Sequence, residues 1–386
     1  MDTRQTLIIG GGVAGITCAL ELQRANIPYT LVSDTIGGRI CYLAEYRMNF
    51  GAVFFMQSYT HAREILTPAS PVLPSPFDLE CHEQLGRGYG VASARVLSAA
   101  PQLARFLSYL VRDFKPRYER FKAACETDEF TEALRRNPAI AELIGQSADE
   151  LIARKRFERA AQVLVSQFVY ACTGSPISTL NALDYLTCAL GIVDGATRFT
   201  FDPAYMHACL EGGSGAVQIA TVTSVERAEG LWQVTTAAHE RLCAPNLVIA
   251  TPADVARSLL APVLGPYEIR AASELHAYKV AGHIKPAYAG HPLHLFDQSI
   301  PLINIGKRAD GAYEVFTCTP LDLGLFFDDY TIEHRVDWPC ALFTHPSIIL
   351  DQDLGEGLYR IGDHNALGLE PAALSGVFAA HRIKER

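Results

Sequence analysis

The chain opens with a short apolar run, a glycine-rich turn and then a stretch of helical periodicity. Residues 5–9 are typical of a buried strand, residues 13–25 of a helix and residues 29–32 of a second strand. Strand–helix–strand units of this kind form parallel sheets that are covered on both faces. We therefore expect an α/β fold that begins with a parallel sheet.

The rest of the chain alternates between segments with a helical pattern and segments with strand patterns. Residues 60–200 are mainly helical in pattern, with the clearest helices expected at 98–114, 129–136 and 147–172. Short strand patterns return from residue 217, and residues 275–320 alternate as in a half-covered antiparallel sheet. The final segment, 358–380, has the pattern of a strand, a glycine-bearing loop and a helix.

Because the helical segments and the strand segments alternate along the chain, we expect two discontinuous domains. Residues 1–60, 211–265 and 346–386 are predicted to form one domain, and residues 61–210 and 266–345 the other.

Composition and charge narrow the class of protein. The 386 residues are 49% hydrophobic and carry a net charge of −9, which argues against a nucleic-acid partner. None of the ten cysteines forms a Cys-x-x-Cys pair, so we expect reduced thiols in a cytoplasmic protein. The first residues, MDTRQ, lead directly into a strand pattern, and no apolar run reaches the ~18 residues of a membrane span, so we expect no signal peptide and no transmembrane segment.

The glycine-rich turn matches a dinucleotide-binding fingerprint. Gly10, Gly12 and Gly15 have the spacing G-x-G-x-x-G between a strand and a helix. The first glycine permits a tight turn, the second lets a pyrophosphate approach the backbone, and the third lets helix and strand pack closely. The fingerprint also predicts an acidic residue about 20 positions later, for the ribose. Ser33 stands at that position and Asp34 follows, so either side chain remains a candidate for the ribose.

Further motifs resemble the flavin-containing amine oxidase superfamily, which includes protoporphyrinogen oxidases and carotenoid desaturases. The matching stretches are Gly37-Gly38-Arg39, "RMNFGAVFF" (47–55), "TVTSVERAEGLWQV" (221–234), "LVIATP" (247–252) and "LYRIGDHNALGLEPAALSGVFAA" (358–380). The resemblance implies a Rossmann-like FAD-binding domain of the GR2 type with an interleaved α+β substrate domain. The loop 33–36 is shorter than in the family, which together with Ser33 implies weaker FAD binding.

The resemblance also implies which residues contact FAD. Gly362 and Asp363 match the family's glycine–acid pair, and Leu369 and Glu370 begin a helix whose N–H groups would face the flavin ring. Pro371 replaces the usual glycine; proline suits a first helical turn but has no N–H to donate. The implied FAD-binding residues are Gly10, Gly12, Val13, Ala14, Gly15, Ser33, Asp34, Gly38, Arg39, Gly51, Ala52, Val222, Gly362, Asp363, Leu369, Glu370 and Pro371.

Two residues are candidates for the chemistry itself. Lys279 occupies the region in which many family members place a lysine near flavin N5, and Trp338 matches an aromatic residue that stands against the flavin. Each also has a purely structural interpretation, an exposed sheet lysine and a core tryptophan. Cys340 does not match a known covalent attachment pattern. The histidines at 276, 283, 291 and 294 have no acid that completes a ligand set, so no metal site is expected.

The resemblance implies an FAD-dependent oxidoreductase that moves a hydride from a C–N or C–C bond of a small-molecule substrate to flavin N5, with O₂ or another acceptor reoxidising the flavin. Three alternatives stay open: a desaturase or dehydrogenase of a hydrophobic substrate, a non-redox flavin-dependent isomerase, and a non-catalytic flavoprotein subunit. A homo-oligomer or a partner subunit that covers the site is compatible with each.

Overall fold

A five-stranded parallel sheet forms one half of the molecule in the computed structural model, which describes residues 4–386. Its strands are β1 (Thr6–Gly11), β2 (Tyr29–Ile36), β10 (Gly215–Ile219), β14 (Asn246–Ile249) and β20 (Leu358–Arg360). They lie in the order β10-β2-β1-β14-β20, and every neighbouring pair is parallel. This is the strand order of doubly wound nucleotide-binding sheets.

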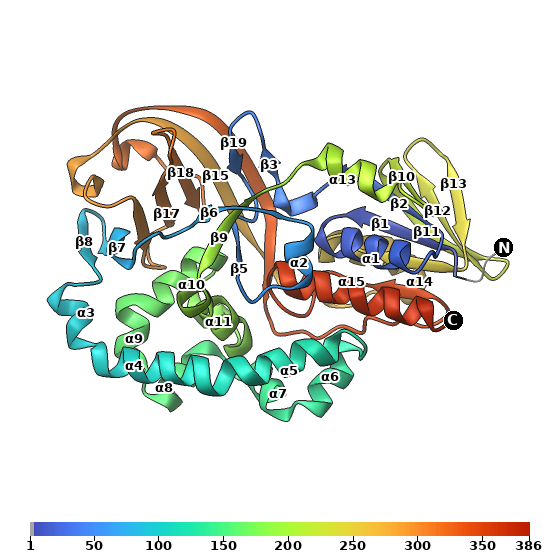
Figure 1. The fold of residues 1–386 in the computed structure, drawn as a ribbon, viewed down its shortest axis with the longest axis horizontal. Coiled ribbons are helices and arrows are strands. Elements are labelled where there is room, and N and C mark those ends of the chain that lie inside the picture. Colours follow the sequence, from blue (N-terminus) through green and yellow to red (C-terminus); the bar gives the residue numbers. More distant parts are fainter. Residues whose placement is uncertain (1–3) are drawn as a thin grey trace.

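Both faces of this sheet are covered, which explains why β1 is a continuous apolar run. Ile8 packs on one side with the helices α1 (Val13–Arg24) and α15 (Leu369–Lys384). Leu7 and Ile9 point to the other side. There they meet α14 (Ala253–Leu264) and a three-stranded antiparallel sheet, whose strands are β11 (Val222–Ala228), β12 (Leu231–Thr236) and β13 (Arg241–Ala244). Figure 1 shows α1 and α15 side by side at the right of the molecule.

A seven-stranded sheet forms the second half, in the order β19-β15-β18-β17-β16-β7-β8. Its strands are β7 (Leu79–Gln84), β8 (Arg87–Gly90), β15 (Ala271–Ile284), β16 (Leu293–Phe296), β17 (Leu302–Lys307), β18 (Tyr313–Thr317) and β19 (Phe327–His345). All pairs are antiparallel except β7 with β16, which is parallel. The antiparallel sheet predicted over 275–320 is therefore confirmed, and the 19-residue strand β19 extends it.

A helical layer completes the second half; in Figure 1, α4 to α8 lie along the lower edge of the molecule, with α10 and α11 above them. It contains α3 (Ala94–Ser98), α4 (Ala100–Tyr109), α5 (Lys115–Cys125), α6 (Phe130–Arg136), α7 (Pro138–Gly145), α8 (Ala148–Lys155), α9 (Glu158–Ala160), α10 (Ser166–Thr173), α11 (Ala182–Ala189) and α12 (Gly191–Asp194). Wider π turns at 110–114 and 161–165 join α4 to α5 and α9 to α10. The single helix expected over 147–172 is wrong: Arg156 adopts a left-handed conformation that ends α8.

Short elements connect the two halves. They are β3 (Tyr42–Leu43), β4 (Met48–Asn49), β5 (Phe54–Met56), α2 (His61–Glu64), β6 (Thr67–Pro71), β9 (Ala196–Thr200) and α13 (Pro203–Leu210). The parallel sheet draws its strands from the first, middle and last parts of the chain. The residue boundaries of the two expected domains remain a prediction.

No helix within residues 4–386 is long and apolar enough to cross a membrane. Residues 1–3, part of the stretch on which the prediction of no signal peptide rests, lie outside the described residues.

Candidate functional site

A cavity of about 560 Å³ is lined by residues from both sheets and from the helical layer. At one end it meets the turn between β1 and α1, and at the other it reaches α5, α10, α11 and the strands β15, β17, β18 and β19. Its volume lies within the roughly 300–1,000 Å³ of small-molecule and cofactor sites. We call these two parts the glycine end and the sheet end.

Gly10, Gly12 and Gly15 lie at the turn between β1 and α1, and the surroundings of each differ. Gly10 has a φ of +111°, and a Cβ on it would lie 2.7 Å from the carbonyl oxygen of Ala250. A Cβ on Gly15 would overlap the carbonyl oxygen of Gly10, so Gly15 allows α1 to pack on β1 from behind the cavity. Gly12 differs, since a Cβ there would meet no atom within 4 Å. Gly10 and Gly12 line the cavity together with Val13 and Ala14, whereas Gly15 does not.

Ser33 and Asp34 are neighbours on β2, but their side chains have different surroundings. The Ser33 hydroxyl accepts a hydrogen bond from Gly11 N at 2.8 Å and donates to Thr35 O at 2.8 Å. Both residues line the cavity, but Asp34 is exposed while Ser33 is buried. Because the serine hydroxyl already holds the glycine turn, Asp34 offers the carboxylate at this edge of the cavity.

Beside the cavity, an ion pair joins Arg39 of the Gly37-Gly38-Arg39 motif to Asp363 of the C-terminal motif. Arg39 donates to Asp363 Oδ1 at 2.6 Å and to the carbonyl oxygen of Ala341 at 2.8 Å. Burial alone raises the pKa of the Asp363 carboxyl, but the Arg39 guanidinium outweighs burial and holds that pKa below its usual range. Both residues line the cavity with Gly38 and Gly362. Segments more than 300 residues apart thus form one charged wall.

Gly51, Ala52 and Val222 also line the cavity, as the resemblance implies. A Cβ on Gly51 would overlap the carbonyl oxygen of Arg39, and Ala52 N donates to that same oxygen at 2.9 Å. The segment 50–52 is therefore held against Arg39 by its backbone.

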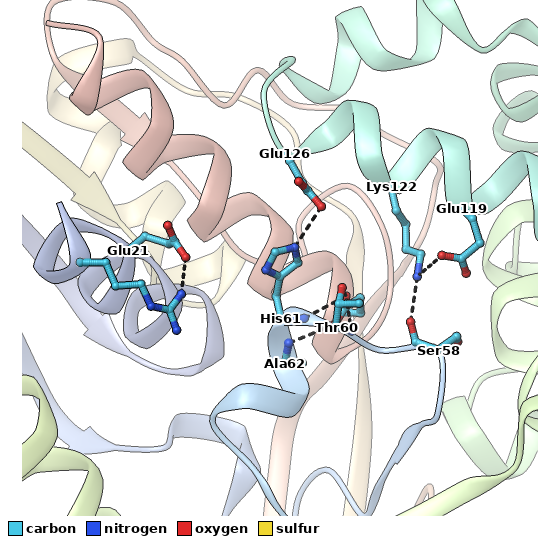
Figure 2. A network of polar contacts seen from close by, with 10 residues as sticks. Glu21, Ser58, Thr60, His61, Ala62, Glu119, Lys122 and Glu126 are labelled. Atoms are coloured by element: carbon cyan, nitrogen blue, oxygen red, sulfur yellow. Dashed lines mark hydrogen bonds and ion pairs between the residues drawn. The ribbon is translucent and has the colours of Figure 1, made fainter.

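The start of α15 differs from the expectation. Leu369 lines the cavity at the first residue of the helix, but Glu370 and Pro371 are not among its lining residues. Glu370 is fully buried and turns to the N-terminus of α2. Its carboxylate accepts hydrogen bonds from Thr60 N (2.8 Å), Thr60 Oγ1 (2.6 Å), His61 N (3.2 Å) and Ala62 N (3.0 Å). Figure 2 shows this loop and the neighbouring contacts. The Glu370 side chain therefore anchors the loop at 60–62. The expectation that the N–H groups at the start of α15 face the flavin ring stays a prediction.

Trp338 lies at the sheet end of the cavity, and its expected position against the flavin stays a prediction. It is partly buried on β19, lines the cavity, and its indole N–H donates to the carbonyl oxygen of Phe50 at 2.6 Å. Leu275, Ile303, Asn304 and Phe316 line the same region. The Asn304 side-chain oxygen is buried without a hydrogen-bond partner among the described residues.

Lys279 does not reach the cavity, which corrects the expectation for this residue. It lies on β15, but its ammonium group pairs with Asp310 Oδ2 at 3.0 Å and Glu333 Oε2 at 3.1 Å. Burial lowers the pKa of Lys279, but the hydrogen bonds to these two carboxylates outweigh burial and raise it above its usual range. A cation held between two carboxylates stays charged and is fixed away from the site.

The structure brings a different lysine to the cavity. Lys122 on α5 is only 6% exposed and lines the cavity beside Tyr118 and Tyr59. Its ammonium group donates to Ser58 O at 3.0 Å and pairs with Glu119 Oε2 at 2.8 Å (Figure 2). No local signal in the sequence marks Lys122, because it lies in an ordinary amphipathic helix and its partner loop is about 60 residues earlier.

The other residues weighed from the sequence lie outside the cavity. Cys340 is not among the lining residues, and burial, together with Asp254, raises the pKa of its thiol. His276 contacts Asp337 and Glu274, and His283 contacts Asp329. His291 and His294 lie beside Glu80 in the seven-stranded sheet.

Comparisons with known proteins identify the fold. No protein-family model matches the chain, and no curated protein matches it. Among solved structures, wild-type putrescine oxidase bound to putrescine matches with a TM-score of 0.68 and 13% identity over 99% of both chains. A double mutant from a redesign of cofactor binding in putrescine oxidase matches equally well, with 13% identity and a TM-score of 0.68 over 99% of both chains. The PF1083 protein from Pyrococcus furiosus matches at 0.60 and 13% identity, over 99% of this chain and 97% of that one. The chain therefore has the fold of putrescine oxidase.

Proposed function

We propose that this chain is an FAD-dependent oxidoreductase of the flavin-containing amine oxidase superfamily. The observation that carries the proposal is the continuity of the cavity: it joins a glycine turn that can receive a pyrophosphate to a partly apolar chamber walled by Trp338. The shared fold with putrescine oxidase supports the same function. The sequence motifs at both ends of the chain agree with it.

The residues present fit an extended dinucleotide such as FAD. The open space at Gly12 leaves room for a phosphate against the turn, where the first N–H groups of α1 and its dipole favour an anion. Asp34 is suited to the ribose hydroxyls, and the Arg39–Asp363 wall to the polar middle of the molecule. Gly368 and Leu369 would bring the N-terminus of α15 towards the flavin ring, where a helix dipole stabilises negative charge.

When bound, FAD supplies the hydride acceptor, and the protein orients the substrate against it and excludes water. Trp338 is held by its bond to Phe50 and offers a rigid wall for the substrate. Leu275, Ile303 and Phe316 give the chamber an apolar lining, and Asn304 offers one uncharged polar group. These groups bind and position the substrate. Because FAD is the hydride acceptor, no side chain at the sheet end has to accept the hydride.

The lining favours a neutral, apolar substrate over a diamine. Among the cavity-lining residues that the structure describes, the only carboxylates are Asp34 at the glycine end and Asp363, which is paired with Arg39. A dication at the sheet end would meet no carboxylate among the lining residues, and Glu119, just outside the lining, is already paired with Lys122. Burying an unpaired charge is costly. Removal of hydrogen from a C–C bond, or from the C–N bond of an uncharged compound, therefore fits the chamber better.

Anaerobic mixing of the flavin-loaded protein with two panels of compounds tests this proposal. One panel contains diamines and polyamines, and the other contains neutral, partly saturated ring compounds. We expect loss of the flavin absorbance with members of the second panel. If the flavin is reduced by dithionite but by no compound in either panel, an oxidoreductase is contradicted; if diamines bleach it fastest, the apolar substrate class is contradicted.

A further inference from the structure

A cluster of histidines and one glutamate lies within the seven-stranded sheet. β7 and β16 pair in parallel, with His294 directly opposite Glu80 and Phe296 opposite His82. Glu80 and His82 are two residues apart on β7, so their side chains leave the same face of the strand. None of the three is among the described residues that line the cavity.

Three ligand atoms of this cluster converge on one point. His82 Nε2 lies 3.0 Å from His294 Nδ1 and 3.4 Å from Glu80 Oε2, and His294 Nδ1 lies 3.2 Å from Glu80 Oε2. Zinc ligands at about 2.0–2.1 Å in a tetrahedron stand roughly 3.3–3.4 Å from one another. The three separations match that arrangement without any change of rotamer.

The hydrogen bonds of the cluster fix the position of one lone pair. His294 Nε2 lies 2.9 Å from the carbonyl oxygen of His291, which can only accept, so the His294 hydrogen is on Nε2 and its Nδ1 presents a lone pair. His82 Nε2 and Glu80 Oε2 both lie close to that nitrogen. A cation at the centre would accept a lone pair from each of the three atoms.

The two imidazoles of the cluster are shielded from solvent. His82 and His294 are almost fully buried, at 0% and 1% exposure. His291 Nδ1 lies 3.6 Å from Glu80 Oε2, and its side chain is partly exposed, so an ion could enter past it.

We propose that Glu80 Oε2, His82 Nε2 and His294 Nδ1 bind a zinc ion. Two imidazoles with one carboxylate suit zinc better than the hard cations Mg²⁺ and Ca²⁺. The bond from His294 Nε2 to the His291 carbonyl orients its ring, as outer contacts do around protein-bound zinc. The three ligands come from β7 and β16, so the ion would join two strands that are more than 200 residues apart.

Metal analysis of tag-free, flavin-loaded protein tests this site independently of enzyme activity. The protein is stripped with a chelator and titrated with Zn²⁺ against a chromophoric competitor. We expect binding of one ion per chain, and affinity at least about tenfold weaker, roughly 1.4 kcal/mol, in Glu80→Gln. His283→Ala is the control, since this exposed histidine pairs with Asp329 outside the cluster, and should leave the affinity unchanged.

Either of two results overturns the site: wild-type affinity no tighter than that of the Glu80→Gln variant, or a sulfur ligand in the X-ray absorption spectrum of the zinc-loaded protein, which would assign the ion to the cysteines. These readouts use the wild-type chain and a variant of the partly exposed Glu80, so they do not depend on whether variants of the buried His82 and His294 fold. A nitrogen- and oxygen-only shell, together with weaker binding in Glu80→Gln, supports the proposal.

Discussion

At the scale of single residues, Gly12 is the most informative position. Its φ of −79° is open to any side chain, and a Cβ there would meet no protein atom within 4 Å. The fold therefore does not require glycine at this position, unlike at Gly10 and Gly15. The reason for glycine is the space in front of it, which we assign to the cofactor phosphates.

The substitution Gly12→Val should remove that space without disturbing the fold. We expect FAD affinity to fall by more than about tenfold, with little change in thermal stability of the cofactor-free protein. Gly145→Val is the matched control, because Gly145 at the end of α7 also faces open space and lies outside the cavity. Fluorescence titration with FAD measures both; equal affinities in the two variants would contradict the role of the turn.

The sequence predicts the backbone around the cavity better than its polar side chains. Gly38, Arg39 and Asp363 line the cavity as expected, because each lies within a motif that a short turn or loop defines. Lys279 and Glu370 do not, because their partners are set by tertiary contacts: Lys279 meets Asp310 and Glu333, and Glu370 meets the loop at 60–62. No local pattern encodes such contacts.

At the scale of elements, the sequence motif predicts where α15 begins but not the contact that its Glu370 side chain makes. The helix begins at Leu369, where the motif places it. Its buried Glu370 holds the N-terminus of α2 through four hydrogen bonds. This contact fixes the connection between β5 and α2, which also supplies Ser58 and Tyr59 to the cavity wall.

The substitution Glu370→Gln should therefore act on stability rather than on the cofactor. An amide cannot accept from donors on both of its ends, so at least one buried N–H loses a charged partner at a cost of about 2 kcal/mol. We expect that loss in urea unfolding with excess FAD, and less than about a threefold change in FAD affinity. Glu64→Gln, on the exposed side of α2, is the control. A large loss of FAD affinity at unchanged stability would contradict this structural role of the Glu370 side chain.

At the scale of the whole molecule, one buried ion pair ties together three distant segments. Arg270, just before β15, donates to Asp184 Oδ2 on α11 at 2.8 Å and to the carbonyl oxygen of Asn365 at 2.7 Å. Both charged side chains are only 1% exposed. The cluster joins the helical layer and the long strands to the loop that leads into α15. The predicted domain bounds place Asp184 and Arg270 in one domain and Asn365 in the other, but they do not predict that the three residues meet.

Replacing Arg270 by Met leaves the Asp184 carboxylate buried without its counter-charge. We expect the free energy of unfolding to fall by about 3–5 kcal/mol at pH 8. Removal of the guanidinium raises the folded-state pKa of Asp184, so the native variant takes up a proton more readily than its unfolded chain, and the deficit should shrink as the pH falls towards 5. Arg24→Met, in an exposed pair with Glu64, should cost less than about 1 kcal/mol at either pH. A pH-independent deficit in Arg270→Met would show that lost packing dominates.

The measurement that tests the central claim most directly is the visible spectrum of the purified protein, followed by acid precipitation and identification of the released chromophore. Because Cys340 lies outside the cavity, we predict that FAD, about one molecule per chain, leaves the precipitate and appears in the supernatant. A folded protein that is colourless and takes up no added FAD would contradict the assignment of the cavity to this cofactor.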